Sequence, residues 1–185
     1  MHYPYRILQI LPRVFCVLLL LAMPAVAAET VPILPQFQAY ATPRSLPSIR
    51  FMDAKGTQKT MADYRGQWVL LNLWATWCAP CRKEMPQLDS LQEVFAETNF
   101  RILPLSIDSS QTAPKIFTFY HDHQIKNLPI LNDPSGMTMA ALKPRGLPSS
   151  WLIAPDGRAV GEVIGYARWD SDAAGNLIEM YLQRK

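Results

Sequence analysis

Cysteine is rare in this chain of 185 residues, which has three, and the shortage excludes several kinds of site. Cys78 and Cys81 are separated by two residues, while Cys16 lies far upstream in an apolar segment. A structural zinc ion takes about four ligands, usually from two Cys or His pairs. The nearest histidines, His121 and His123, come about forty residues later, so a zinc site lacks its second half. A scaffold held by several disulfides is excluded for the same reason.

An excess of charge of one sign is also missing. The chain has 18 Lys and Arg against 15 Asp and Glu. Arg6 and Arg13 belong to a leader-like segment at the N-terminus, and without them the balance is 16 against 15. A net charge of +1 gives no basic surface for nucleic acid, so no partner of that kind is expected.

No uninterrupted apolar run reaches the ~20 residues that a helix needs to cross a bilayer. The apolar segment Val14–Met23 has about ten residues, follows Arg6 and Arg13, and precedes the small residues Ala25-Val26-Ala27. That order is typical of a secretory signal. We therefore expect a signal peptide over residues 1–28, with an uncleaved membrane anchor as the alternative. Such a chain is exported, and its expected location is the periplasm.

The rest of the chain is expected to hold one domain. Residues 29–48 contain four prolines and few charges, which favours an extended linker, and the folded domain is expected over 49–185. Continuous apolar runs at Val69–Trp74 and Arg101–Ile107 indicate strands buried on both faces. Other strands and helices alternate with them, and hairpin patterns stand at both ends. The order predicts an α/β domain of three α/β/α layers with a mixed sheet.

The chemistry is expected in the run Trp77-Cys78-Ala79-Pro80-Cys81, where the first buried strand meets a helical pattern. Backbone N–H groups at a helix N-terminus, together with the helix dipole, stabilise a thiolate. Cys78 is the expected attacking sulfur, and Cys81, about one turn on, is expected to resolve a mixed disulfide. A purely structural disulfide is the alternative, although so short a loop removes little chain entropy.

These residues and their surroundings resemble the thioredoxin superfamily, and within it the exported TlpA/ResA-like branch. The resemblance covers about Leu46 to Leu182. It implies a thioredoxin-like three-layer α/β/α sandwich with a central mixed sheet and an N-terminal β-hairpin extension. The matching segments follow one another in the order Arg65-Gly66, Leu71–Pro86, Gly146–Ser149, Pro155–Arg158 and Gly165–Asp170.

The resemblance also implies site residues beyond the cysteines. Pro148 matches the cis-proline of the superfamily, and the backbone of Leu147 would hold an extended substrate peptide through strand-like hydrogen bonds. Asn72 departs from thioredoxin, which has a buried aspartate there, and Asn cannot accept a proton. Glu84 is the expected substitute in proton transfer. The alternative for Glu84 is a solvated carboxylate near the start of a helix.

Three residues beside the cysteines are expected to shape the substrate surface. Trp77 would pack next to the disulfide, and Ala79 and Pro80 form the loop between the sulfurs, where Pro80 suits the first turn of a helix. His121 and His123 are expected at a solvated helix end, with copper binding as the alternative.

The sequence therefore predicts a periplasmic thiol-disulfide oxidoreductase. The family resemblance favours reduction of a client protein, of the cytochrome c or copper-site maturation type. Electrons would come from a membrane thiol donor of the DsbD/CcdA type. No cofactor or metal is expected, and the chain is expected to be a monomer.

Three other functions compete with this prediction. An oxidant of DsbA type usually has a larger helical insertion than the segment between Asp108 and Pro148 allows. A Cu(I) metallochaperone would use Cys78 and Cys81 as soft ligands. A peroxidase is disfavoured because Ala75 stands where peroxiredoxin-like members have threonine.

Overall fold

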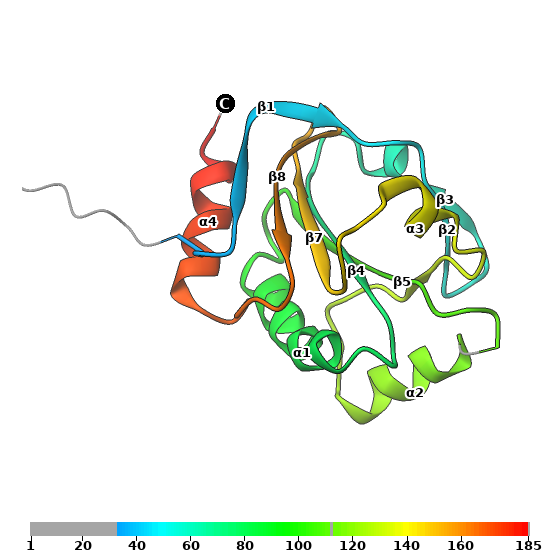
Figure 1. The fold of residues 1–185 in the computed structure, drawn as a ribbon. Coiled ribbons are helices and arrows are strands. Elements are labelled where there is room, and N and C mark those ends of the chain that lie inside the picture. The colour runs from blue at the N-terminus through cyan, green and yellow to red at the C-terminus, as the bar shows by residue number, and fades with distance from the viewer. Residues whose placement is uncertain (1–32, 112, 185) are drawn as a thin grey trace, which may run out of the picture. The chain divides into compact units, whose positions relative to one another are not determined.

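The computed structural model describes residues 33–111 and 113–184, which form a mixed sheet with helices packed on its faces (Figure 1). A short 3₁₀ helix, Met61–Tyr64, follows the third strand. The other elements are β1 (Gln38–Ser45), β2 (Arg50–Asp53), β3 (Gln58–Thr60), β4 (Trp68–Trp74), α1 (Ala79–Val94), β5 (Phe100–Ser106), α2 (Pro114–Asp122), β6 (Leu131–Asn132), α3 (Met137–Leu142), β7 (Ser149–Ile153), β8 (Arg158–Ile164) and α4 (Asp172–Leu182).

The strands form one sheet in the order β1-β8-β7-β4-β5-β6-β2-β3. The pairs β4–β5 and β5–β6 are parallel, and the other pairs are antiparallel. β4 lies between β5 and β7, and every one of its residues is buried, as its continuous apolar run predicts. The segment that follows β4 therefore starts at the C-terminal end of a central strand.

Alternate residues of the central strands face two separate apolar layers. Leu70 and Ile102 belong to the layer under α1, α2 and α4. Leu71 and Leu103 belong to the opposite layer, which includes side chains of α3 and of the 3₁₀ helix. The three layers, the mixed sheet and the early hairpin confirm the predicted thioredoxin-like fold, although the second helical layer is thin.

The structure corrects part of the linker that was expected over residues 29–48. Residues 38–45 form β1, which pairs antiparallel with β8 at the end of the sheet. Pro43 lies between Ala39 and Arg44, where the register of that pairing is irregular. Proline is tolerated at such places because no ladder hydrogen bond is needed from its nitrogen. The prolines were therefore a misleading signal, and the sheet begins before residue 49.

The predicted signal peptide, residues 1–28, lies outside the described residues. Within residues 33–111 and 113–184, no helix combines the length and the apolar character needed to cross a membrane.

Candidate active site

Cys78 and Cys81 form a disulfide at the N-terminal end of α1, just after β4. Cys78 is the N-cap residue, and its sulfur accepts a hydrogen bond from the backbone N–H of Cys81 at 3.3 Å. Pro80 lies in the first turn, where a missing N–H costs no helical hydrogen bond. Both sulfurs thus lie where the helix dipole and free N–H groups favour a thiolate.

The two cysteines differ in burial. Cys81 is fully buried, whereas Cys78 retains 7% of its surface. Trp77, immediately before Cys78, is 65% exposed, and Ala79 and Pro80 are exposed as well. The residues expected to shape a substrate surface therefore surround the more accessible sulfur. Cys78 is thus the less completely buried of the two cysteines.

The bond between Leu147 and Pro148 is cis, which confirms the predicted cis-proline. Pro148 immediately precedes β7, and the carbonyl of Pro148 accepts a hydrogen bond from Gly165 N–H at 2.8 Å. In the pairing of β4 with β7, Leu73 is opposite Ser149. The Leu147–Pro148 segment therefore lies beside the end of β4 that leads to the cysteines. Its role in holding a substrate stays a prediction.

Glu84 is fully buried one turn beyond Cys81, so the alternative of a solvated carboxylate is wrong. Its Oε1 accepts a hydrogen bond from Asn72 Nδ2 at 2.7 Å. Its Oε2 accepts from Trp169 Nε1 at 3.3 Å and from the backbone N–H of Ala167 at 3.5 Å. Burial raises the pKa of Glu84 to about 8, against the opposing effect of these three hydrogen bonds.

Asn72 links Glu84 to β7. Its Nδ2 also donates to Ser150 Oγ at 2.9 Å, while its Oδ1 has no hydrogen-bond partner among the described residues. An amide and a hydroxyl do not titrate near neutral pH, so Glu84 is the titratable member of this buried network. That Glu84 takes the place of the aspartate of thioredoxin in proton transfer stays a prediction.

Asp108 also belongs to the site, although the sequence did not predict it there. It is fully buried just after β5 and accepts hydrogen bonds from Thr76 N–H at 2.9 Å and Thr76 Oγ1 at 2.8 Å. Ser106 Oγ donates to the same carboxylate at 2.7 Å. Asp108 thus ties the loop before Cys78 to the neighbouring strand. Asp108 follows a buried strand that runs parallel to β4, so the C-terminal ends of both strands lie side by side. That position was the one sequence signal that pointed to the site.

His121 and His123 lie exposed at the end of α2, as expected of a solvated helix end. His121 Nδ1 is 3.1 Å from Asp122 Oδ1, and the ring of His123 packs against Phe119. Within the part of the chain that the structure describes, no group of three or more His, Cys, Asp or Glu side chains is placed to hold a metal ion.

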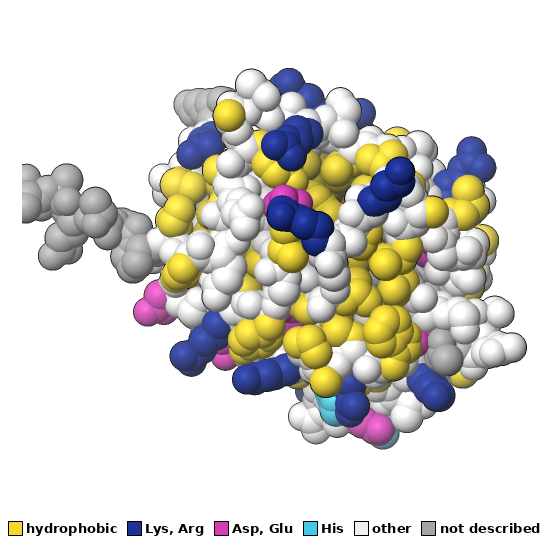
Figure 2. Space-filling model, viewed as in Figure 1, with side chains coloured by type: hydrophobic (Ala, Val, Ile, Leu, Met, Phe, Trp, Pro, Cys, Tyr) yellow, Lys and Arg dark blue, Asp and Glu magenta, His cyan; other side chains and the backbone are white. Residues whose placement is uncertain are grey.

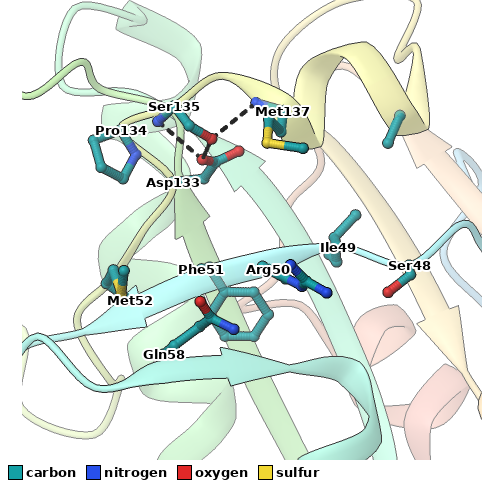
Figure 3. Close-up of a pocket in the computed structure, with 11 residues that line it drawn as sticks. Ser48, Ile49, Arg50, Phe51, Met52, Gln58, Asp133, Pro134, Ser135 and Met137 are labelled. Atoms are coloured by element: carbon teal, nitrogen blue, oxygen red, sulfur yellow. Dashed lines mark hydrogen bonds between the residues drawn. The ribbon is translucent and has the colours of Figure 1, made fainter.

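A cavity of about 540 Å³ lies between β2 and α3, away from the disulfide (Figure 3). Its lining includes the exposed thioethers of Met52 and Met137. Polar atoms on its upper side belong to the turn before α3, where Asp133 accepts from Ser135 N–H at 3.0 Å and Ser135 Oγ accepts from Met137 N–H at 3.2 Å. No lining residue belongs to the cysteine loop or to the cis-proline loop, so this cavity is separate from the redox site.

Comparison with known proteins agrees with this geometry. Residues 41–160 match the model of the AhpC/TSA family. A thiol-disulfide oxidoreductase ResA of Bacillus cereus is 30% identical over 141 residues, which is 76% of each chain. The solution structure of a thiol:disulfide interchange protein from Bacteroides sp. aligns with a TM-score of 0.63 at 25% identity, over 80% of this chain and 95% of that one.

A second solved structure supports the fold alone. It is a thiol:disulfide interchange protein of the thioredoxin family from Chlorobium tepidum TLS. It aligns with a TM-score of 0.63 at 23% identity, over 78% of this chain and 99% of that one.

Proposed function

This chain belongs to the AhpC/TSA family and is a thiol-disulfide oxidoreductase of the ResA type, and on that premise we propose that it reduces disulfides of exported client proteins. The observation that carries the proposal is the Cys78–Cys81 disulfide at the start of α1, in which Cys81 is fully buried and Cys78 keeps 7% of its surface exposed. The Leu147–Pro148 segment, beside the end of β4, offers backbone groups to an extended client.

The proposed reaction begins from the reduced protein. The Cys78 thiolate attacks one sulfur of the client disulfide, which breaks the client S–S bond, forms a mixed disulfide and releases one client thiolate. The Cys81 thiolate then attacks the Cys78 sulfur, which re-forms the Cys78–Cys81 disulfide and releases the second client thiolate. Two electrons pass to the client. An external dithiol must then reduce the protein again.

Glu84 has a proposed role in the second step. The Cys81 thiol must lose its proton before it attacks, and Glu84 lies three residues along the same helix. With a pKa raised to about 8 by burial, its carboxyl group can hold or accept a proton near neutral pH. Glu84 is therefore assigned the acid–base role, with Asn72 and Trp169 holding its two oxygens.

The remaining parts of the proposal rest on the leader-like N-terminus and on the family resemblance. We place the protein in the periplasm, with a client of the cytochrome c or copper-site maturation type and a membrane thiol donor of the DsbD/CcdA type. We assign Trp77, Ala79 and Pro80 to client binding because they flank the cysteines in the chain. Leu147 is assigned with them because the segment before β7 lies beside the end of β4 that leads to Cys78. The protein is proposed to act as a monomer.

The reduction potential of the Cys78–Cys81 pair tests whether the protein reduces or oxidises its clients. It is measured by Trp fluorescence in thiol/disulfide buffers. We expect a value near or below that of thioredoxin, about −270 mV. A value near that of DsbA, about −120 mV, would make the protein an oxidant and overturn the proposed direction.

The mixed disulfide tests the mechanism. A Cys81→Ala variant should accumulate covalent adducts with client proteins on nonreducing electrophoresis, and a Cys78→Ala variant should not, because its remaining sulfur is buried. Absence of adducts in both variants would contradict the exchange mechanism.

A further inference from the structure

A groove lies beside the redox site, between the loop that precedes Cys78 and helix α2. It has a volume of about 320 Å³, and we call it the α2 groove. Trp77 and Phe119 supply apolar surface, Arg82 and Lys115 supply positive charge, and Asp122 and His123 complete the end formed by α2. Its volume is at the small end of ligand-binding pockets, so it suits one or two side chains of a partner.

The apolar part of the α2 groove is open to solvent on one side. Trp77 is 65% exposed, an unusual state for the largest apolar side chain. Phe119 is buried against Trp74, with ring centroids 5.1 Å apart, and forms a fixed floor. An exposed indole and a buried aromatic ring in one lining offer contact area to the apolar part of an incoming side chain.

The α2 groove has two positive side chains that are not paired with carboxylates in the described residues. Arg82 and Lys115 are both exposed, and neither forms an ion pair within residues 33–111 and 113–184. Asp122 is the carboxylate of the lining, and it is next to His121 Nδ1 at 3.1 Å. The groove therefore presents two cations, one from α1 and one from α2, that an anion could pair with. On the face of the molecule drawn in Figure 2, hydrophobic side chains form patches with Lys and Arg side chains beside them.

The position of the α2 groove relative to the reactive sulfur is fixed by hydrogen bonds. Asp108 holds Thr76, on the loop that carries Trp77, and Arg82 N–H donates to the carbonyl of Cys78 at 3.0 Å. A client chain joined to Cys78 must lie next to Trp77, because the two residues are adjacent. Side chains near the client cysteine are then within reach of the groove.

We propose that the α2 groove selects clients with a carboxylate close in sequence to the reacting cysteine. The aliphatic part of a client Glu or Asp packs on Trp77, and its carboxylate pairs with Arg82 and Lys115. This inference rests on the proposed function and narrows its class of client. Exposed ion pairs of this kind change kcat/KM by about two- to five-fold per cation.

The test uses two synthetic peptide disulfides that differ in one residue, Glu or Gln, two positions from the cysteine. Their reduction by the reduced full-length protein gives two kcat/KM values. We expect the Glu peptide to be preferred by about five-fold or more at low salt, and the preference to shrink at 1 M salt, where the Debye length is about 3 Å. The ratio of the two values cancels any change that a variant causes in the reactivity of the Cys78 thiol, since both peptides meet the same thiol.

Three variants separate the α2 groove from net charge. Lys115→Glu should abolish or reverse the preference, and Arg82→Gln should reduce it. Arg184→Glu changes the net charge as much as Lys115→Glu does, near the C-terminal end of α4 and far from α2 in Figure 1, and should keep the preference.

The remaining results would each contradict either the role of the α2 groove or the proposed function. Equal rates for the two peptides in the wild type, or an unchanged preference in Lys115→Glu, overturn the assignment of the α2 groove and leave the oxidoreductase proposal standing. Loss of the preference in Arg184→Glu overturns it too, since net charge would then be the cause. Failure to reduce either peptide would instead defeat the proposed function.

Discussion

Glu84 is a carboxyl group in two conflicting environments. All three of its hydrogen-bond partners donate to it, and donors favour the ionised form. Its complete burial favours the neutral acid, and that effect is larger, so its pKa rises to about 8. A group balanced in this way can change its protonation state with a small change nearby, such as the reduction of the adjacent disulfide.

The raised pKa of Glu84 predicts a pH-dependent stability. The folded state keeps a proton on Glu84 between its ordinary pKa of 4.5 and about 8, whereas the unfolded state does not. Stability from this group is therefore present below pH 4.5 and is lost as pH rises toward 8, at up to about 1.4 kcal/mol per pH unit. Urea denaturation of Glu84→Gln should show a flatter dependence of the free energy of unfolding over this window.

The matched control is Glu93→Gln, which changes an exposed glutamate on the same helix. Its pH dependence should follow that of the wild type. The same slope in Glu84→Gln and in the wild type would show that Glu84 does not titrate in this window.

Individual site residues were predictable to different degrees. Cys78 and Cys81 follow from their spacing, and the position of Glu84 follows from its place one turn beyond them. Its partners Ala167 and Trp169 lie more than 80 residues away in sequence, so no local pattern could bring them to it. The place of Asp108 in the site could not be predicted for the same reason, because its contact with Thr76 forms only once β4 and β5 are paired.

Among the elements, those with strong apolar patterns were predicted best. β4 and β5 follow from continuous apolar runs, even though β5 contains Pro104 in its centre. Pro104 is opposite Asn72 on β4, and β6 pairs with β5 only from Leu105 onward, so no partner on that side needs the missing N–H. β1 was missed because its residues are mostly exposed, and the strand depends on pairing with β8.

The pairing of β1 with β8 depends on a small residue at position 161. A Cβ added to Gly161 would lie 2.8 Å from the backbone oxygen of Gln38 and would collide with the ring of Phe37. The backbone of β1 cannot move away from a new side chain without losing its hydrogen bonds to β8. Gly161→Ala should therefore destabilise the protein by about 1–3 kcal/mol, seen as a lower melting temperature.

Gly175→Ala is the matched control. Gly175 lies inside α4, and a Cβ there meets nothing within 4 Å. Alanine favours a helix over glycine by about 1 kcal/mol, so this variant should melt at a higher temperature. Equal shifts in the two variants would mean that β1 does not constrain residue 161.

At the scale of the whole molecule, the segment from Leu34 to Ser45 contributes to the core and also covers one edge strand of the sheet. Leu34 is 2% exposed within the layer under α4, and the ring of Phe37 contacts that of Tyr181 at 5.7 Å. β1 itself covers the edge of β8. Removing this segment would expose apolar side chains and a long unpaired strand together, a combination that promotes association between chains.

A chain that begins at residue 46 should therefore melt at a lower temperature than one that begins at residue 33, and should associate on size-exclusion chromatography. The two differ in the segment that contains β1, so the longer chain is the control. If both run as monomers with the same melting temperature, the segment contributes neither to the core nor to edge protection.

The unequal access of the two sulfurs also has a kinetic consequence. Cys81 is buried three residues from Cys78, so in the proposed reaction the sulfur that frees the client is always supplied from within the same helix turn. Release is then a first-order event, governed by an effective concentration inside the protein. The rate of this release step does not depend on how much free thiol surrounds the complex. This internal route releases the client at the same rate in a reducing and in an oxidising compartment.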